Sequence, residues 1–195
     1  MSRCTERQQE IIDAALTLID EKGIQGMTIK NLSIKLGISE SAIYRHFENK
    51  IHILLALFDL VKHKSSELIE FELNSSQPVA QKIEHLFEKH FESFSNMPSL
   101  ASVVFSEEIF RNEKKLIEKA SEIIAYNLKI LQEIFKEAQL NKEIRTDIGP
   151  DYLGIIVMGT LRLFIKNWHF SKFSYDLQKE GNKLTSEIKL LITKQ

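Results

Sequence analysis

The sequence predicts an all-α protein, with an N-terminal three-helix head followed by a C-terminal helical bundle, about nine helices in total. Three observations support this fold class. The 195-residue chain has only 7 Gly and 3 Pro, its apolar residues recur at intervals of three and four, and few segments alternate with period two. The length suits one or two small domains. We place the head at residues 1–50 and the bundle at residues 51–195.

The first helix of the head has a clear start and a clear stop. Thr5 and Gln8 form a Thr-x-x-Gln capping box, which satisfies two free backbone donors at a helix N-terminus. Gly23 is expected to end the helix. The apolar positions between them are Ile11, Ile12, Ala15, Leu18 and Ile19.

Residues 28–50 predict two short helices joined by a tight turn. Thr28 and Ser39 are placed to cap the two helices. Gly37 directly follows the last apolar residue of the first, as a turn through positive φ requires. Ile29, Leu32 and Leu36 then share one face of the first helix, and Ile43 and Phe47 share one face of the second. This spacing is that of a helix-turn-helix, whose second helix enters the DNA major groove.

The polar residues left facing outward suit contact with DNA. Hydroxyl, imidazole and ammonium groups donate to phosphate oxygens, and basic or acidic side chains read base edges. We assign phosphate contacts to Thr28, Ser39, Ser41, Tyr44, His46 and Lys50, and base contacts to Lys30, Glu40, Ser41 and Arg45. The residues alone leave a second interpretation open, in which the turn belongs to a helical hairpin of some other bundle.

A longer stretch of the sequence resembles the TetR-like family of bacterial transcription regulators. The resemblance rests on the run Leu36-Gly37-Ile38-Ser39, then Ile43-Tyr44, His46-Phe47 and Lys50, together with Ile11-Ile12, Ala14-Ala15, Leu18, Gly23 and Thr28-Ile29 upstream. It covers roughly residues 5 to 55. Two positions depart from the pattern: Ala42 replaces a frequent Thr, and Glu40 places an acid where the family varies. The resemblance implies a dimeric regulator, most often a repressor, whose body encloses a pocket for a small-molecule inducer.

The remaining helices are separated by polar or proline-containing breaks. Asn49 is placed to cap a fourth helix that runs to about Leu73, and Pro78 opens a fifth. Asn96-Met97-Pro98 forms another break. Asn112 is placed to cap a long helix that reaches about Gln139, and a loop follows from Asn141 to Pro150.

The last two helices predict a homodimer interface. From Asp151 to Phe170 apolar residues occur almost all round the helix, so it must be covered on both sides. The final helix carries apolar residues in steps of four and three, a narrow seam that suits a partner helix. The alternative is that both helices close the core of a monomer. The expected interface residues are Ile156, Leu163, Leu177, Leu184, Ile188 and Leu191.

Between the head and this seam lies a segment rich in aromatic residues. Bulky apolar walls with a few polar groups suit an apolar or amphipathic ligand. Ordinary core packing is the alternative interpretation for each residue. The expected pocket residues, with the pocket itself implied by the resemblance, are Phe91, Phe94, Phe105, Tyr126, Asn127, Arg162 and Trp168.

Composition restricts the classes of function. The net charge is −1, and residues 28–50 carry four Lys or Arg against two Glu, so the positive charge is local. This favours a dimer on a palindromic operator over a non-specific DNA coat. The single cysteine, Cys4, suggests a reducing compartment, and the apolar run 152–161 is too short to span a bilayer. We therefore expect a cytoplasmic protein.

No constellation for catalysis or metal binding is visible in the sequence. The six histidines contain no His-x-x-x-His pair, and there is no glycine-rich phosphate loop or nucleophile elbow. We expect neither enzyme activity nor a cofactor or metal. The predicted function is a sequence-specific DNA-binding transcriptional regulator, a repressor released from a palindromic operator by a small-molecule inducer. The alternative is a helical adaptor that uses the head for protein contacts.

Overall fold

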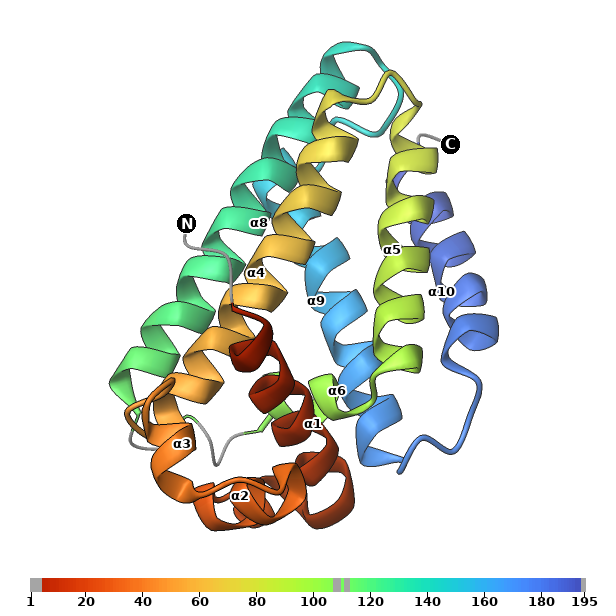
Figure 1. The fold of residues 1–195 in the computed structure, drawn as a ribbon. Coiled ribbons are helices and arrows are strands. Elements are labelled where there is room, and N and C mark those ends of the chain that lie inside the picture. Colours follow the sequence, from red (N-terminus) through yellow and green to blue (C-terminus); the bar gives the residue numbers. More distant parts are fainter. Residues whose placement is uncertain (1–4, 107–109, 111–112, 194–195) are drawn as a thin grey trace. The chain divides into compact units, whose positions relative to one another are not determined.

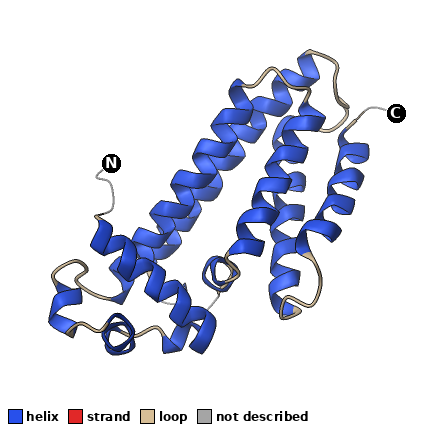
Figure 2. Cartoon of the chain, turned by 45° about the vertical axis from the view of Figure 1, so that its right-hand side comes forward, coloured by secondary structure: helices blue, strands red, loops and turns tan. Residues whose placement is uncertain are grey.

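The computed structural model describes residues 5–106, 110 and 113–193, and within them every regular element is a helix (Figure 2). The predicted all-α fold is confirmed. Two compact units are present, the first from residues up to 61 with 98–120, the second from 62–97 with 121–195. The described helices are α1 (Glu6–Gly26), α2 (Ile29–Leu36), α3 (Glu40–Tyr44), α4 (Lys50–Asn74), α5 (Val79–Asn96), α6 (Ser99–Val104), α8 (Lys114–Leu140), α9 (Pro150–Phe170) and α10 (Leu177–Ile192).

The predicted helix N-caps at Thr5 and Asn49 are confirmed, and the predicted end of the first helix at Gly23 is corrected to Gly26. The Thr5 side chain accepts from the Gln8 backbone N–H, and the Gln8 side chain accepts in return from the Thr5 N–H at 3.0 Å. Gly23 interrupts α1 with φ 68° and ψ 177°, and one further turn continues to Gly26. Asn49 caps α4 by accepting from the His52 N–H at 3.1 Å. The predicted cap at Asn112 lies outside the described residues.

The core of the first unit forms where α1 packs against α2 and α6. α6 is a helix that the sequence analysis did not identify. The Phe58 and Phe110 rings meet edge to face at 5.8 Å between centroids. The fully buried aliphatic and sulfur side chains of this unit include Ile11, Ile12, Met27, Leu32, Ile43, Ile53 and Leu57.

In the second unit, α5 and α10 lie side by side along most of their length (Figure 1). An ion pair between Lys189 Nζ and Glu84 Oε2, 2.6 Å apart, joins them at the surface. Further along the same two helices, Phe91 of α5 is fully buried and faces Gly181 of α10. Phe164 of α9 contacts the Phe91 ring edge to face at 5.8 Å, so three helices meet at one aromatic side chain.

Within the second unit, α4 and α8 are linked by polar contacts. Lys62 Nζ lies 3.6 Å from Glu122 Oε2, and the Tyr126 hydroxyl donates to Glu70. The hydrogen bond to Glu70 raises the pKa of the Tyr126 phenol. The two contacts join the side chains of Glu122 and Tyr126 on α8 to α4.

The C-terminus of α8 offers a test of backbone strain. Glu143 N–H donates to the Ala138 carbonyl at 2.9 Å, and Lys142 N–H donates to the Gln139 carbonyl at 3.1 Å, which together form a Schellman motif. Lys142 occupies the left-handed position with φ 60°, where glycine is preferred.

We expect Lys142→Gly to raise the free energy of unfolding by about 0.5–1 kcal/mol, measured by urea denaturation. Lys136→Gly, at an exposed position inside the same helix, should instead lower it by about 1 kcal/mol. A destabilising Lys142→Gly would contradict this account.

Candidate functional site

The helix-turn-helix of α2 and α3 has the local geometry that its sequence predicts. The Thr28 hydroxyl accepts from the Asn31 N–H at 3.1 Å and so caps α2. Gly37 turns the chain with φ 65° and ψ 31°, and Ile38 N–H donates to the Ser33 carbonyl at 3.1 Å. The Ser39 hydroxyl then caps α3 by accepting from the Ala42 N–H at 3.2 Å. α3 ends at Tyr44, so Phe47 reaches the core from beyond the helix rather than from within it.

Most of the residues predicted to contact DNA lie on one exposed surface of α2, the turn and α3. Tyr44 is 50% exposed, although it is a large aromatic residue. The Ser39 and Ser41 hydroxyls lie 2.9 Å apart, so both oxygens are held at the start of α3. The predicted residues that the structure leaves exposed are Thr28, Lys30, Ser39, Glu40, Ser41, Tyr44 and Arg45.

Two of the predicted contact residues, His46 and Lys50, are half-buried. Lys50 Nζ donates to the Ile24 carbonyl at 2.8 Å, just beyond the interruption at Gly23. The ammonium therefore supports the end of α1, a structural role that the sequence analysis missed because the two residues are 26 positions apart. The donor directed at the Ile24 carbonyl is not available to a phosphate.

The positive charge of this surface is smaller than the residue count suggests. Lys35 Nζ is paired with Glu21 Oε1 at 2.8 Å. Lys30 and Arg45 have no ion-pair partner among the described residues, so they are the side chains best placed to meet an anion. Two cations give a weak non-specific attraction to DNA, so tight binding needs specific contacts or a second copy of the surface.

The six residues predicted for the dimer interface divide into three groups by burial. Leu177 and Ile188 are buried within their own chain, where α10 packs against α5, so a partner subunit cannot cover them. Ile156 and Leu184 are half-buried. Leu163 and Leu191 are exposed. The expectation that the whole seam of α10 faces a partner is therefore revised, because its 177, 181 and 188 positions already pack on α5.

An exposed apolar stripe lies on α9, at positions 152, 155, 159, 163 and 170. Tyr152, Ile155, Leu163 and Phe170 are each more than half exposed. Gly159 lies between them, and a Cβ at this position would meet no atom of another helix within 4 Å. The sequence analysis named only Leu163 of this stripe, because every face of α9 is apolar and the pattern alone does not show which one is covered.

The structure places the predicted pocket residues in different surroundings. Phe91 and Trp168 are core residues: Phe91 is fully buried, and Trp168 Nε1 donates to the Tyr175 carbonyl at 2.9 Å. Phe105 belongs to the first unit, whereas the other six belong to the second. Phe94, Tyr126, Asn127 and Arg162 are half-buried. Burial lowers the pKa of the Arg162 guanidinium, which identifies a partly desolvated cation on α9.

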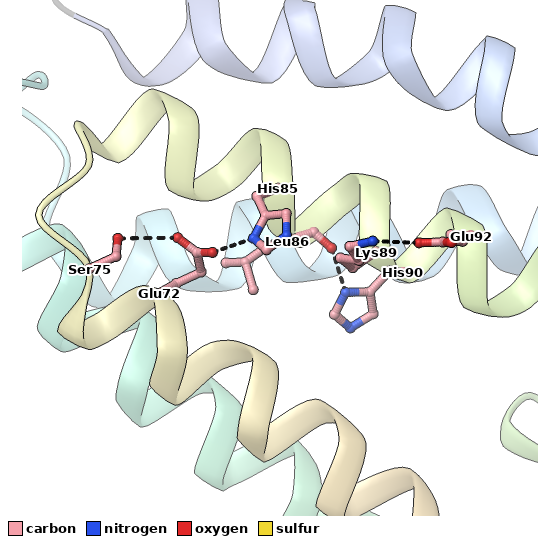
Figure 3. Close-up of polar contacts among 7 residues, drawn as sticks. All are labelled: Glu72, Ser75, His85, Leu86, Lys89, His90 and Glu92. Atoms are coloured by element: carbon pink, nitrogen blue, oxygen red, sulfur yellow. Dashed lines mark hydrogen bonds and ion pairs between the residues drawn. The ribbon is translucent and has the colours of Figure 1, made fainter.

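A cavity of about 920 Å³ lies where α4 and α5 meet. None of the predicted pocket residues lines it. Its wall includes Glu67, Glu70 and Glu72, and the buried Glu72 carboxylate binds His85 Nδ1 on α5 and the Ser75 hydroxyl (Figure 3). Three carboxylates on its wall disfavour an anionic ligand. Among the described residues, no group of three or more His, Cys, Asp and Glu side chains is arranged to hold a metal ion.

No helix within the described ranges is long and apolar enough to cross a membrane.

Comparison with known proteins agrees with the geometry of the head. The model of the bacterial regulatory proteins, tetR family, matches residues 11–57, and that of the YsiA-like protein C-terminal region matches residues 61–194. The chain is 26% identical to the fatty acid metabolism regulator protein of Bacillus subtilis over 99% of this chain and 97% of that one. It is 23% identical to the probable acrEF/envCD operon repressor of Escherichia coli K12, over 93% and 84% respectively.

Solved structures of similar proteins share the fold. The fatty acid degradation regulator FadR from Bacillus halodurans superposes with a TM-score of 0.83, at 24% identity over 97% of this chain and 96% of that one. The regulator FadR from Bacillus subtilis, solved in complex with stearoyl-CoA, superposes with a TM-score of 0.77, at 26% identity over 92% and 96%.

An exposed helix-turn-helix in a helical protein defines the class, a DNA-binding transcription regulator. The chain belongs to the tetR family of bacterial regulatory proteins, whose two models together span nearly its whole length. The resemblance found in the sequence, and with it the predicted function class, is confirmed.

Proposed function

We propose that this regulator binds a palindromic operator as a homodimer and is released from it by a long-chain acyl-CoA. Residues 1–50 act as the DNA-binding domain in this proposal, and residues 51–195 bind the ligand and the partner. The observation that carries the DNA-binding part is the exposed surface of α2 and α3, with its capped helix starts and its two unpaired cations.

The roles of individual residues on this surface follow from their chemistry. Arg45 and Lys30 can donate to guanine O6 and N7 from the major groove, and Glu40 can accept from cytosine N4. The hydroxyls of Thr28, Ser39, Ser41 and Tyr44 can donate to phosphates. His46 and Lys50, at the edge of the exposed surface of α2 and α3, are proposed to contact phosphates as well. Because the unpaired positive charge is small, two heads on one operator are needed for tight binding.

The exposed stripe on α9 supports a homodimer. Contiguous apolar side chains at a helical spacing are rarely left in water, and they are typical of protein interfaces. The open space above Gly159 allows close approach of a second helix. We propose that Tyr152, Ile155, Leu163 and Phe170 form the centre of the interface. Ile156, Leu184 and Leu191 lie at its margin.

An acyl-CoA is proposed as the ligand because one relative at 26% identity, matched over almost the whole chain, was solved with stearoyl-CoA. The second unit of this chain supports the choice through Arg162, a partly desolvated cation on α9 that would attract a phosphate or thioester oxygen. The half-buried Phe94, Tyr126 and Asn127 remain candidates to line the site. The acidic cavity between α4 and α5 does not suit an anionic ligand.

Selection from a random DNA pool tests the proposal. The full-length protein should enrich an inverted repeat whose half-sites are about one turn of DNA, or somewhat more, apart. Micromolar palmitoyl-CoA should then dissociate the complex, followed by fluorescence anisotropy of the labelled operator. An adaptor that uses the head for protein contacts would enrich no motif, and this outcome would overturn the proposal.

Substitutions on the DNA-binding surface should separate base contacts from phosphate contacts. We expect Arg45→Ala and Lys30→Ala to relax the sequence preference at particular operator positions, at about 1–3 kcal/mol each. Tyr44→Phe should weaken binding to all sequences alike. Repeating the selection with each variant measures these preferences. Uniform weakening by Arg45→Ala would move that residue to the phosphate class.

A further inference from the structure

Asn127 and His90, two half-buried residues of the second unit, each carry a hydrogen-bond acceptor to which no described residue donates. Asn127 of α8 directs Nδ2 to Ser65 Oγ on α4 at 3.4 Å, while its Oδ1 is buried and has no hydrogen-bond partner. His90 of α5 places Nδ1 2.7 Å from the Leu86 carbonyl oxygen. Its Nε2 has no partner in the described ranges.

The contacts of Ser65 determine which end of the Asn127 amide lacks a partner. Ser65 Oγ lies 3.2 Å from the Lys62 carbonyl, to which it donates its single proton. The same oxygen must then accept from Asn127, so the amide nitrogen faces Ser65 and the amide oxygen faces away from it. The group that would complete the Asn127 site is therefore a donor.

The contact of His90 leads to the same conclusion. A carbonyl oxygen only accepts, so Nδ1 carries a proton and Nε2 of the neutral ring carries a lone pair. Burial lowers the pKa of His90 and favours this neutral form. The ring lies on the side of α5 that faces α4 (Figure 3), the helix that Asn127 contacts from α8. One acceptor thus lies on α8 beside α4, and the other lies on the side of α5 turned toward α4.

We propose that the ligand of this regulator donates a hydrogen bond to Asn127 Oδ1, with His90 Nε2 as a second acceptor. The site then selects a ligand whose polar portion carries N–H or O–H groups. This inference rests on the acyl-CoA response proposed above, because the coenzyme portion contains amide N–H and hydroxyl donors, whereas an ionised fatty acid has none. A buried acceptor without a donor lowers the stability of the ligand-free protein, so its presence is explained by a ligand that completes it.

The test uses Asn127→Leu, with Gln132→Leu, an amide at an exposed position of the same helix, as the matched control. We expect Asn127→Leu to raise the melting temperature of the ligand-free protein and to weaken palmitoyl-CoA binding at least tenfold by calorimetry. Its affinity for ionised palmitate and for operator DNA should be unchanged. His90→Phe should weaken palmitoyl-CoA binding at least threefold, which gives a second test independent of the first. Gln132→Leu should change none of these quantities.

Each other outcome overturns the inference in a recognisable way. If the wild-type protein binds palmitoyl-CoA and Asn127→Leu and His90→Phe bind it equally well, the acyl-CoA response stands and the donor assignment is wrong. A parallel loss of palmitate binding would show that the substitution collapsed the site. A lower melting temperature for Asn127→Leu would show that the amide as a whole, including its bond to Ser65, stabilises the ligand-free protein, and the argument from an unsatisfied acceptor would fail. If the wild-type protein binds operator but not palmitoyl-CoA, the proposed ligand class is wrong, and the inference fails with it.

Discussion

Replacing Ile155 and Leu163 together by Glu should convert the protein to a monomer and lower operator affinity by about two orders of magnitude or more. Both side chains are more than half exposed in the single chain, so the substitution should leave the fold of the subunit intact. In a dimer the two carboxylates would be placed in a dry interface without a cation to meet them, which costs several kcal/mol. Sedimentation should show a change from about twice the chain mass to the chain mass of 22.6 kDa.

The control for this experiment is Leu140→Glu. Leu140 is 75% exposed at the end of α8 and lies outside the proposed interface. This variant should remain dimeric and bind operator with wild-type affinity. A folded, dimeric Ile155→Glu/Leu163→Glu protein would exclude the α9 stripe as the interface. A monomer that still bound operator tightly would instead refute the need for two heads.

The local parts of the fold could be predicted from the sequence because the interactions that define them join residues three or four positions apart. The Thr5 capping box, the Asn49 cap and the left-handed Gly37 each depend on hydrogen bonds within one turn. The helix-turn-helix was predictable for the same reason. The apolar residues of the two helices had to be buried, so the remaining residues could be assigned to the exposed face.

Contacts between distant residues could not be predicted in this way. Lys50 was expected to serve only phosphate, but its bond to the Ile24 carbonyl depends on how α4 meets the end of α1. Ile188 was assigned to a partner subunit, but it packs within its own chain. Periodicity shows that a face is apolar and does not show which helix covers it. The exposed stripe of α9 and the acceptor on Asn127 therefore became visible only in the structure.

Gly181→Leu is expected to lower the free energy of unfolding of the second unit strongly, because position 181 has no room for a side chain. A Cβ at position 181 would lie 2.4 Å from two ring carbons of Phe91, far inside van der Waals contact. The Phe91 ring cannot easily turn away, because it is fully buried and contacts Phe87 and Phe164 edge to face, each at 5.8 Å. The strain must therefore separate α10 from α5.

Gly181→Ala should already lower the free energy of unfolding by about 1–3 kcal/mol in urea denaturation, and Gly181→Leu by more. Gly154→Ala, inside α9, is the matched control. Its Cβ would lie 3.8 Å from atoms of Leu128 and Leu131 on α8, an ordinary van der Waals distance. It should be neutral or stabilising. Phe91→Leu should partly rescue Gly181→Ala, so the two substitutions together should cost less than their sum. Strict additivity would show that the ring is not what excludes a side chain at position 181, and that α5 and α10 are held by other contacts.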